Sequence, residues 1–182
     1  MTPGDVGIDG VVPVSVSAHR DDRGALSELY RRSWLPLAPP VVQANLSRSE
    51  PGVLRGMHFH RRQADFQVFV DGIATIGLFD LRAGSPSQGR SAAIRVDAAE
   101  EALGLYIPPG VAHGFCAVTE VVLVYLVDKE FTGQDEYGIA WDDPGLGIDW
   151  PLSPPTLSAR DRANPPLATV LYDPPLYAAP LG

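Results

Sequence analysis

Short runs of apolar and β-branched residues, each followed by turn-forming residues, recur through the middle of the chain. These runs predict strands at Val53–His60, Asp65–Val70, Ala74–Leu81, Ala92–Val96, Leu103–Ile107, Phe115–Ala117 and Val121–Asp128. Turn signals separate them at Asp71-Gly72, at residues 83–89 and at Pro108–Gly110. The run Leu123–Val127 is almost wholly apolar, so we expect that strand to be buried on both faces. Many short strands at near-regular spacing indicate an antiparallel sandwich or barrel.

The pattern is weaker towards both ends of the chain. Val11–Ser17 alternates like an edge strand, where Pro13 is tolerated, and Ser158–Asp161 resembles the start of a short helix. No internal repeat and no linker divides the chain, so we expect a single domain. The predicted segments are a flexible lead at 1–10, N-terminal strands at 11–50, the barrel core at 53–130 and an irregular C-terminal segment at 131–182.

Composition narrows the class of protein further. The 182 residues include 18 glycines and 18 prolines, which favours turns over long helices. The net charge of −8 argues against binding to nucleic acid or to an anionic membrane surface. The single cysteine, Cys116, excludes an intrachain disulfide and is typical of a reducing compartment. Because no apolar run approaches the roughly 20 residues of a membrane span and no secretory leader is visible, we expect a cytoplasmic protein.

Three of the four histidines fall in two short segments. His58 and His60 are separated by one residue, so on a strand both side chains point to the same face. Asp65 follows them, and a turn at residues 108–110 precedes His113. Two hairpins of a small barrel would bring these four side chains to one point, which predicts a functional site there.

Several longer phrases carry a resemblance to a known family. They are DDRG at 21–24, GVLRGMHF at 52–59, IPPGVAHGF at 107–115, WDDP at 141–144, IDWP at 148–151 and LSARD at 157–161. From Asp22 to about Leu167 the sequence resembles the dTDP-4-dehydrorhamnose 3,5-epimerase family, a branch of the cupins. The resemblance implies an all-β fold, the cupin jelly-roll β-barrel (double-stranded β-helix). It also implies a homodimer, with residues 11–50 as the dimerisation segment and an N-terminal strand exchanged between subunits.

The same resemblance implies proton transfer beside the ketone of a dTDP-linked 4-keto-6-deoxy sugar, in deoxysugar or natural-product biosynthesis and without a cofactor. His58 would be the base, and the Asp161 carboxylate would fix its tautomer. Arg55 and His113 would polarise the ketone, and Tyr125 matches a tyrosine of the family. The residues that would hold the nucleotide and its diphosphate are Arg23, Glu28, Gln43 and Asn45.

The chain also departs from the family at its active site. Asp65 stands where the family has a lysine, and His60 stands where it has a glutamine. A family tyrosine near Glu130-Phe131 is absent, and aromatic residues that stack on the thymine are replaced by Ala25 and Leu26. We therefore expect an epimerase or isomerase with an altered or single-site outcome.

Two of these departures favour an alternative, a metal-dependent cupin enzyme. Three imidazoles and one carboxylate suit Fe(II), Mn(II), Ni(II) or Zn(II) with open positions for a substrate. Such an enzyme would catalyse oxidation, dehydration, cyclisation or isomerisation of a metabolite that is not a sugar nucleotide. As a metal ligand, His58 could not also be the free base, and Asp161 would then orient the His58 ring. The ligand set of this alternative is His58, His60, Asp65 and His113.

Simpler roles for these residues stay open as well. His60 can be a hydrogen-bonded interior group, and Asp65 can pair with Arg61 or Arg62 at a hairpin. A barrel that only binds a sugar or a partner is a third hypothesis for the whole chain, motivated by the missing tyrosine.

Overall fold

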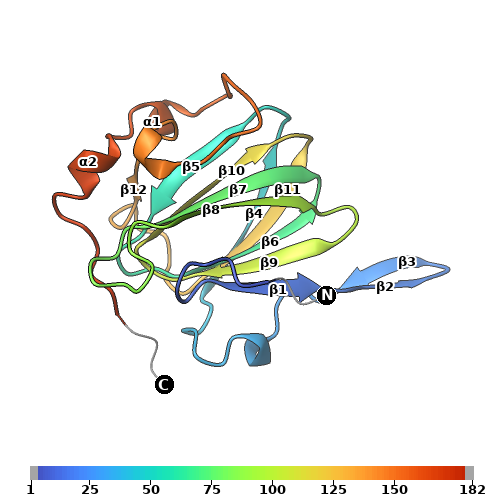
Figure 1. Cartoon of the computed structure of the whole chain (residues 1–182). Coiled ribbons are helices and arrows are strands. Elements are labelled where there is room, and N and C mark those ends of the chain that lie inside the picture. The colour runs from blue at the N-terminus through green and yellow to red at the C-terminus, as the bar shows by residue number, and fades with distance from the viewer. Residues whose placement is uncertain (1–3, 179–182) are drawn as a thin grey trace.

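Two five-stranded antiparallel sheets face each other and enclose the core of the protein (Figure 1). The computed structural model describes residues 4–178. The first sheet contains, in spatial order, β1 (Val12–Val16), β9 (Ala102–Ile107), β6 (Asp65–Asp71), β11 (Val121–Val127) and β4 (Gln43–Ser49). The second contains β12 (Tyr137–Gly138), β5 (Leu54–Phe59), β10 (Val111–Ala117), β7 (Ile73–Asp80) and β8 (Ser91–Asp97). A separate two-stranded hairpin consists of β2 (Ala18–Asp21) and β3 (Gly24–Ser27).

The chain passes back and forth between the two sheets. From β8 to β12 each strand lies in the sheet opposite to the strand before it. Every strand pair is antiparallel, including pairs far apart in sequence, such as β10 with β5 and β11 with β4. This topology confirms the predicted all-β cupin jelly roll.

The core strands lie where the sequence pattern places them, with one exception. The bounds of β5 to β9 and of β11 agree with the predictions within one residue at each end. The predicted Phe115–Ala117 is too short, because β10 begins directly after the Gly110 turn and includes His113 and Gly114. The adjacent His113 and Gly114 weaken the apolar pattern that predicts a strand. In the structure His113 lines the cavity and Gly114 lies against the backbone of β5.

The inward face of the strands changes from polar to apolar along their length. On β6, Asp65 and Gln67 line a cavity, whereas Phe69 lies in the main core. Phe69 packs edge-on against Phe115 of β10, with ring centroids 5.4 Å apart and planes at 88°. One end of the barrel interior is therefore a packed core, and the other end is available for a ligand.

The ends of the chain cover part of the outer face of each sheet. The C-terminal segment carries three short helices, η2 (Pro144–Leu146), α1 (Ala159–Arg162) and α2 (Leu167–Val170), and lies over the second sheet in Figure 1. Leu146 and Leu167 of this segment pack with Met57 and Phe59, which point outward from β5. On the other side the N-terminal segment with η1 (Arg32–Trp34) covers part of the first sheet. Within the described residues, none of the helices is long and apolar enough to cross a membrane.

Two sequence predictions about burial are wrong. The predicted flexible lead is anchored in its described part, because Ile8 is only 2% exposed and packs into the main core. The strand β11 is not buried on both faces throughout, since Val124, Tyr125 and Leu126 are half-buried. Tyr125 faces the cavity, so the inner surface there is not filled by core side chains.

A buried ionic network closes the turn between β7 and β8. Asp80 has no exposed surface and accepts hydrogen bonds from Arg82 Nε at 2.7 Å and from Ser85 and Ser87 at 2.6 Å each. Burial raises the pKa of the Asp80 carboxyl. The hydrogen bonds from Arg82 and the two serines lower that pKa by more, so the net shift is downward. The carboxylate is thus the anchor of this turn.

We expect Asp80→Asn to destabilise the fold by about 3–5 kcal/mol, because it leaves the buried Arg82 guanidinium without its charged partner. Urea unfolding measures this loss. The matched control is Glu120→Gln, which removes an exposed pair with Arg48 at 3.7 Å and is expected to change stability by less than about 0.5 kcal/mol. Similar losses for the two variants would contradict the assignment.

Candidate active site

A cavity of about 450 Å³ opens between the two sheets. Strands β4, β5, β6, β10 and β11 contribute its walls. Eight of the eleven residues that the sequence nominates for chemistry line it, namely Gln43, Asn45, Arg55, His58, His60, Asp65, His113 and Tyr125. The prediction that the two histidine segments converge inside the barrel is therefore confirmed.

A β-bulge on β5 places Arg55 on the same face as the two histidines. His58 pairs with His113 of β10 and Arg55 pairs with Phe115, so three steps along β5 match two steps along β10. If the three steps from Arg55 to His58 were paired regularly, without a bulge, Arg55 would point outward with Met57 and Phe59. The bulge turns its guanidinium into the cavity, where Nε donates to Ser49 Oγ at 2.8 Å.

Glycines make this bulge possible. Gly56 has a φ of 130°, and a Cβ added there would lie 2.7 Å from Cα of Gly114 on the neighbouring strand. The two backbones approach so closely that neither position has room for a side chain.

His58 and Asp161 form a short hydrogen bond although they are 103 positions apart in the sequence. The His58 Nε2 to Asp161 Oδ1 distance is 2.6 Å, and the Asp161 side chain is 5% exposed. Asp161 is held at the start of α1, where its main-chain N–H donates to the N-cap Ser158 Oγ at 3.0 Å. Burial raises the pKa of Asp161, but the hydrogen bond and charge of His58 outweigh it, and the net shift is downward. An ionised carboxylate only accepts, so Nε2 of His58 carries the hydrogen and Nδ1 keeps a lone pair.

His60, Asp65 and His113 form a second group in the same cavity. Asp65 Oδ1 lies 3.9 Å from His60 Nε2, and Oδ2 lies 3.4 Å from His113 Nε2. The ligand atoms of the three residues all lie within 4.8 Å of one another, and all three residues are buried. His58 is outside this group, so the structure gathers three of the four residues of the alternative ligand set.

The electrostatics of this second group favour charged partners. Burial raises the pKa of Asp65, but His113 and His60 lower it more, so the net shift is downward. Burial lowers the pKa of His113, but Asp65 raises it more, so the net shift is upward. The simpler role suggested for Asp65, pairing with Arg61 or Arg62, is not observed. The Arg61 guanidinium contacts Asp173 instead, and Gln63 Nε2 donates to Asp65 Oδ1 at 2.8 Å.

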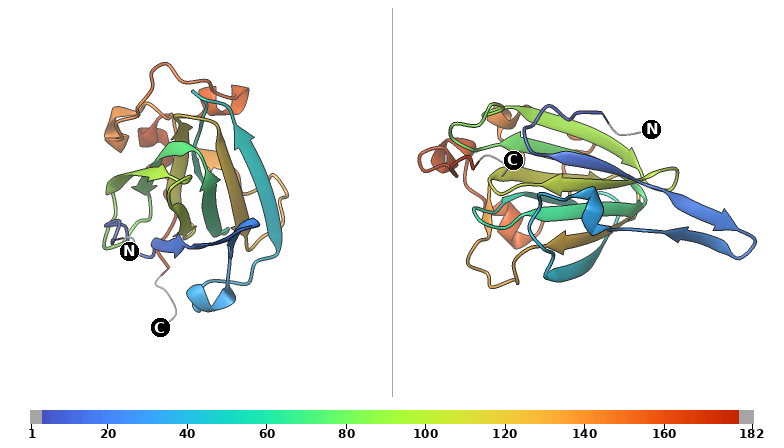
Figure 2. Two further views of the ribbon diagram at one scale, coloured as in Figure 1. Left: turned by 90° about the vertical axis from the view of Figure 1, so that its right-hand side faces the viewer. Right: turned by 90° about the horizontal axis from the view of Figure 1, so that it is seen from below.

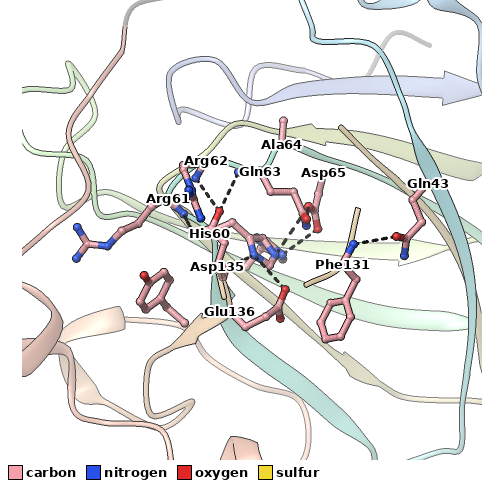
Figure 3. A network of polar contacts seen from close by, with 12 residues as sticks. Gln43, His60, Arg61, Arg62, Gln63, Ala64, Asp65, Phe131, Asp135 and Glu136 are labelled. Atoms are coloured by element: carbon pink, nitrogen blue, oxygen red, sulfur yellow. Dashed lines mark hydrogen bonds and ion pairs between the residues drawn. The ribbon is translucent and has the colours of Figure 1, made fainter. Parts of the chain in front are cut away.

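Asp135 holds the loop that follows β5, as Figure 3 shows. Its carboxylate accepts the main-chain N–H groups of Arg61 and Arg62 at 2.9 Å each and of Gln63 at 3.2 Å. Its own carbonyl accepts from His60 Nδ1 at 2.6 Å. This loop anchor was not found from the sequence, because a lone aspartate in a polar segment gives no signal of its partners.

Other cavity residues were not found from the sequence either. Among them are Gln63, Phe131, Glu136 and Arg160. Glu136 Oε2 pairs with Arg160 at 3.0 Å, and the Phe131 N–H donates to Gln43 Oε1 at 2.9 Å. Phe131 is 67% exposed and lines the cavity, so it lies at the cavity mouth.

Two nominated nucleotide-binding residues do not reach this cavity. Arg23 pairs with Asp21, and Glu28 pairs with Arg31, all within the N-terminal segment. The β2–β3 hairpin that carries Arg23 extends away from the barrel (Figure 2). Within one chain, these two residues therefore cannot contact a ligand bound beside His58.

Tyr125 presents a phenol on the cavity wall. Burial raises its pKa, and so do the charges of Asp65 and Glu136, against a smaller opposing effect of Arg55. Its hydroxyl is therefore protonated at neutral pH and is able to donate a hydrogen bond.

The barrel and its cavity, with the half-buried His58 paired to the buried Asp161, have the architecture of a cupin-type enzyme. Residues 5–169 match the family described as dTDP-4-dehydrorhamnose 3,5-epimerase, and the chain belongs to this family. The resemblance read from the sequence is thereby confirmed.

Individual relatives agree with this assignment. A dTDP-4-dehydrorhamnose 3,5-epimerase of Streptomyces griseus is 38% identical over 160 residues, which cover 83% of this chain and 79% of the relative. NovW, a 4-keto-6-deoxy sugar epimerase from the novobiocin gene cluster of Streptomyces spheroides, superposes with a TM-score of 0.87 at 34% identity, covering 97% of this chain and 94% of NovW. ChmJ, a 3′-monoepimerase of Streptomyces bikiniensis solved with dTDP-quinovose, gives a TM-score of 0.86 at 34% identity, covering 97% and 93%. These similarities support an isomerase of the epimerase type over a metal-dependent enzyme acting on another metabolite.

We expect Gly56→Ala to lower stability by at least about 2 kcal/mol, from backbone strain and from the contact with Gly114. Urea unfolding measures the loss. Gly84→Ala is the matched control, because Gly84 also has a positive φ of 85° but open space around it. Equal losses in both variants would show that the close approach of β5 and β10 costs nothing.

Proposed function

We propose that the chain catalyses epimerisation beside the C4 ketone of a dTDP-linked 4-keto-6-deoxy sugar. The observation that carries this proposal is the His58–Asp161 pair at 2.6 Å on the wall of a cavity large enough for a ligand. Membership of the family, and similarity to sugar epimerases such as NovW and ChmJ, supply the substrate class.

In the proposed reaction Nδ1 of His58 removes the proton from the carbon beside the ketone. The electrons of the C–H bond pass to the carbonyl oxygen and form an enolate, while Asp161 stabilises the imidazolium. Arg55 and His113, which share the cavity with His58, place positive charge near the developing oxyanion. A proton returned to the opposite face of the carbon completes the inversion. The reaction changes no oxidation state and uses no redox cofactor.

We assign the returning proton to Tyr125, a neutral phenol in the same cavity. Phe131, at the rim, has no hydroxyl to offer. With one phenol instead of two, the chain is expected to invert a single carbon, as the name of the monoepimerase ChmJ describes for that protein. Biosynthesis of a deoxysugar-bearing natural product is the setting that NovW suggests.

A homodimer completes the proposed nucleotide site. The projecting β2–β3 hairpin carries Arg23, and β4, at the opposite edge of the first sheet from β1, exposes 61% of Leu46. A hairpin that reaches into a neighbouring copy would bring Arg23 and Glu28 to the neighbour's Gln43 and Asn45. The buried free thiol of Cys116 agrees with a cytoplasmic location for the assembly.

The decisive measurement is deuterium uptake from heavy water into a dTDP-4-keto-6-deoxy sugar, followed by mass spectrometry. We expect exchange at one ring carbon in the wild type and a loss of about 10³-fold or more in His58→Asn, which lacks the base. Asp161→Asn is expected to lose about 10²-fold or more, because the amide no longer fixes the tautomer. Glu120→Gln, at an exposed residue that does not line the cavity, is the control and is expected to exchange at the wild-type rate. Absence of exchange in the wild type would refute the proposal. If the nucleotide sugar then still binds, the result would favour a protein that only binds the sugar.

The dimer is tested by co-expressing two differently tagged variants, His58→Asn and Arg23→Ala, each nearly inactive alone. If the hairpin completes the neighbour's cavity, each mixed dimer contains one intact site, and random pairing restores about a quarter of the wild-type activity. If each chain uses its own hairpin, no site in the mixture is intact and no activity returns.

A further inference from the structure

The second group in the cavity, His60, Asp65 and His113, poses a chemical problem that the proton-transfer reaction does not solve. All three side chains are buried, with exposed fractions of 7%, 5% and 7%. In residues 4–178, the ion-pair partners of Asp65 are these two histidines. A buried carboxylate is costly unless a positive group lies beside it.

The hydrogen bonds of the two imidazoles decide which nitrogen faces Asp65. His60 Nδ1 lies 2.6 Å from the carbonyl of Asp135, and His113 Nδ1 lies 3.1 Å from the carbonyl of Val111. A carbonyl only accepts, so both Nδ1 atoms carry the hydrogen. In the neutral rings, both Nε2 lone pairs then point towards the Asp65 carboxylate. In that state three acceptors converge on one point, and either a proton on one ring or a bound metal ion can satisfy them.

The distances distinguish a metal ion from a proton. An imidazolium hydrogen-bonded to a carboxylate brings N and O to about 2.7–2.9 Å. The N–O distances here are 3.9 Å for His60 and 3.4 Å for His113. Two ligands bound tetrahedrally to one ion at about 2.1 Å stand about 3.4 Å apart. The His60 distance is too wide for a direct hydrogen bond, and the His113 distance, at the upper limit of one, equals the spacing of two ligands around a shared ion.

The orientation of the rings agrees with the same conclusion. A histidine that binds a metal through one nitrogen characteristically donates its other N–H to a backbone carbonyl or a carboxylate, which fixes the ring. Both rings do so, and Gln63 donates to the Asp65 carboxylate as a further support. Figure 3 shows the side chains of His60, Asp65 and Gln63 close to one another, next to Asp135.

We propose that His60, Asp65 and His113 bind one divalent transition-metal ion in the wall of the cavity. Two imidazoles and one carboxylate suit Zn²⁺, Mn²⁺, Fe²⁺, Co²⁺ or Ni²⁺ and leave coordination positions open towards the cavity. His58 stays outside the ligand set, because the ligand atoms that lie within 4.8 Å of one another belong to the other three residues, while His58 pairs with Asp161. Base and metal site therefore coexist, and no residue has to serve both.

The position of the site suggests its use. His58 and His113 are directly paired across β5 and β10, so the ion would lie near the atoms on which the base acts. A divalent ion there would polarise a carbonyl oxygen of the bound ligand as a Lewis acid. This role rests on the proposed epimerase function, whereas binding of the ion does not.

The test is titration of the full-length chain, stripped with a chelator, with Zn²⁺ by calorimetry and with Co²⁺ by visible absorption. We expect about one ion per chain, ligand-field bands of imidazole-bound Co²⁺, and a metal-dependent rise in melting temperature. His60→Gln and Asp65→Asn are each expected to weaken binding by about 100-fold or more. Circular dichroism shows whether each variant folds, and His113→Gln replaces any variant that does not.

Two controls sharpen the result. His58→Asn lies two residues from His60 on the same face and is expected to keep full metal binding, as is the exposed His19→Ala. Failure of the wild type to bind either ion stoichiometrically would overturn the proposal. So would binding that survives His60→Gln and Asp65→Asn, or that is lost in His58→Asn. Deuterium exchange in the stripped protein is scored separately, so the epimerase proposal stands or falls on its own result.

Discussion

The hydrogen bond between His58 and Asp161 joins the barrel to the segment that wraps it. His58 belongs to the central part of the second sheet, and Asp161 to a one-turn helix near the end of the chain. The helix is held in place by apolar packing of the C-terminal segment, in which Leu146, Leu167 and Ile139 cover Met57 and Phe59. The orientation of the candidate base therefore depends on the hydrophobic contact between that segment and the outer face of β5. Stability and chemistry share a single contact surface here.

Strand periodicity lets the same strands serve both purposes. Met57 and Phe59 point outward and bury apolar surface, while His58 and His60 between them point inward. Along β6, the inward positions pass from Asp65 through Gln67 to Phe69, from cavity to core. A rigid apolar end supports a polar end, and the polar side chains are positioned by strands rather than by loops. This arrangement fixes the directions of several charged groups within a small volume.

Much of the fold could be predicted because strand signals are local. Alternation and turn residues located β5 to β9 and β11 closely, and the spacing of His58 and His60 correctly gave their common face. The shortened prediction for β10 and the supposed flexible lead failed where tertiary contacts decide the outcome. Ile8 is buried by strands that lie far away in the sequence. No local pattern reveals that.

The sequence predicted which residues belong to the candidate site, but not that they form two separate groups. Sequence motifs nominated His58, His60, Asp65 and His113 together, yet only the folded chain separates His58 with Asp161 from the other three. Hydrogen bonds to Asp135 and Val111, which decide the tautomers of two rings, involve main-chain carbonyls that any residue type could supply. Residues such as Glu136 and Phe131 enter the cavity from the irregular segment, where no periodicity constrains them.

The bulge on β5 has a consequence for which backbone changes the protein tolerates there. Between Arg55 and His58, three steps along β5 match two steps along β10, and this extra residue lets both side chains face the cavity. If a substitution straightened the strand while the number of residues stayed the same, the pairing would become regular, and the guanidinium would turn to the outer surface while the histidines stayed where they are. A variant with an unchanged set of cavity residues would then lack one cation at its centre. The backbone conformation of three peptide units thus decides whether this positive charge enters the cavity.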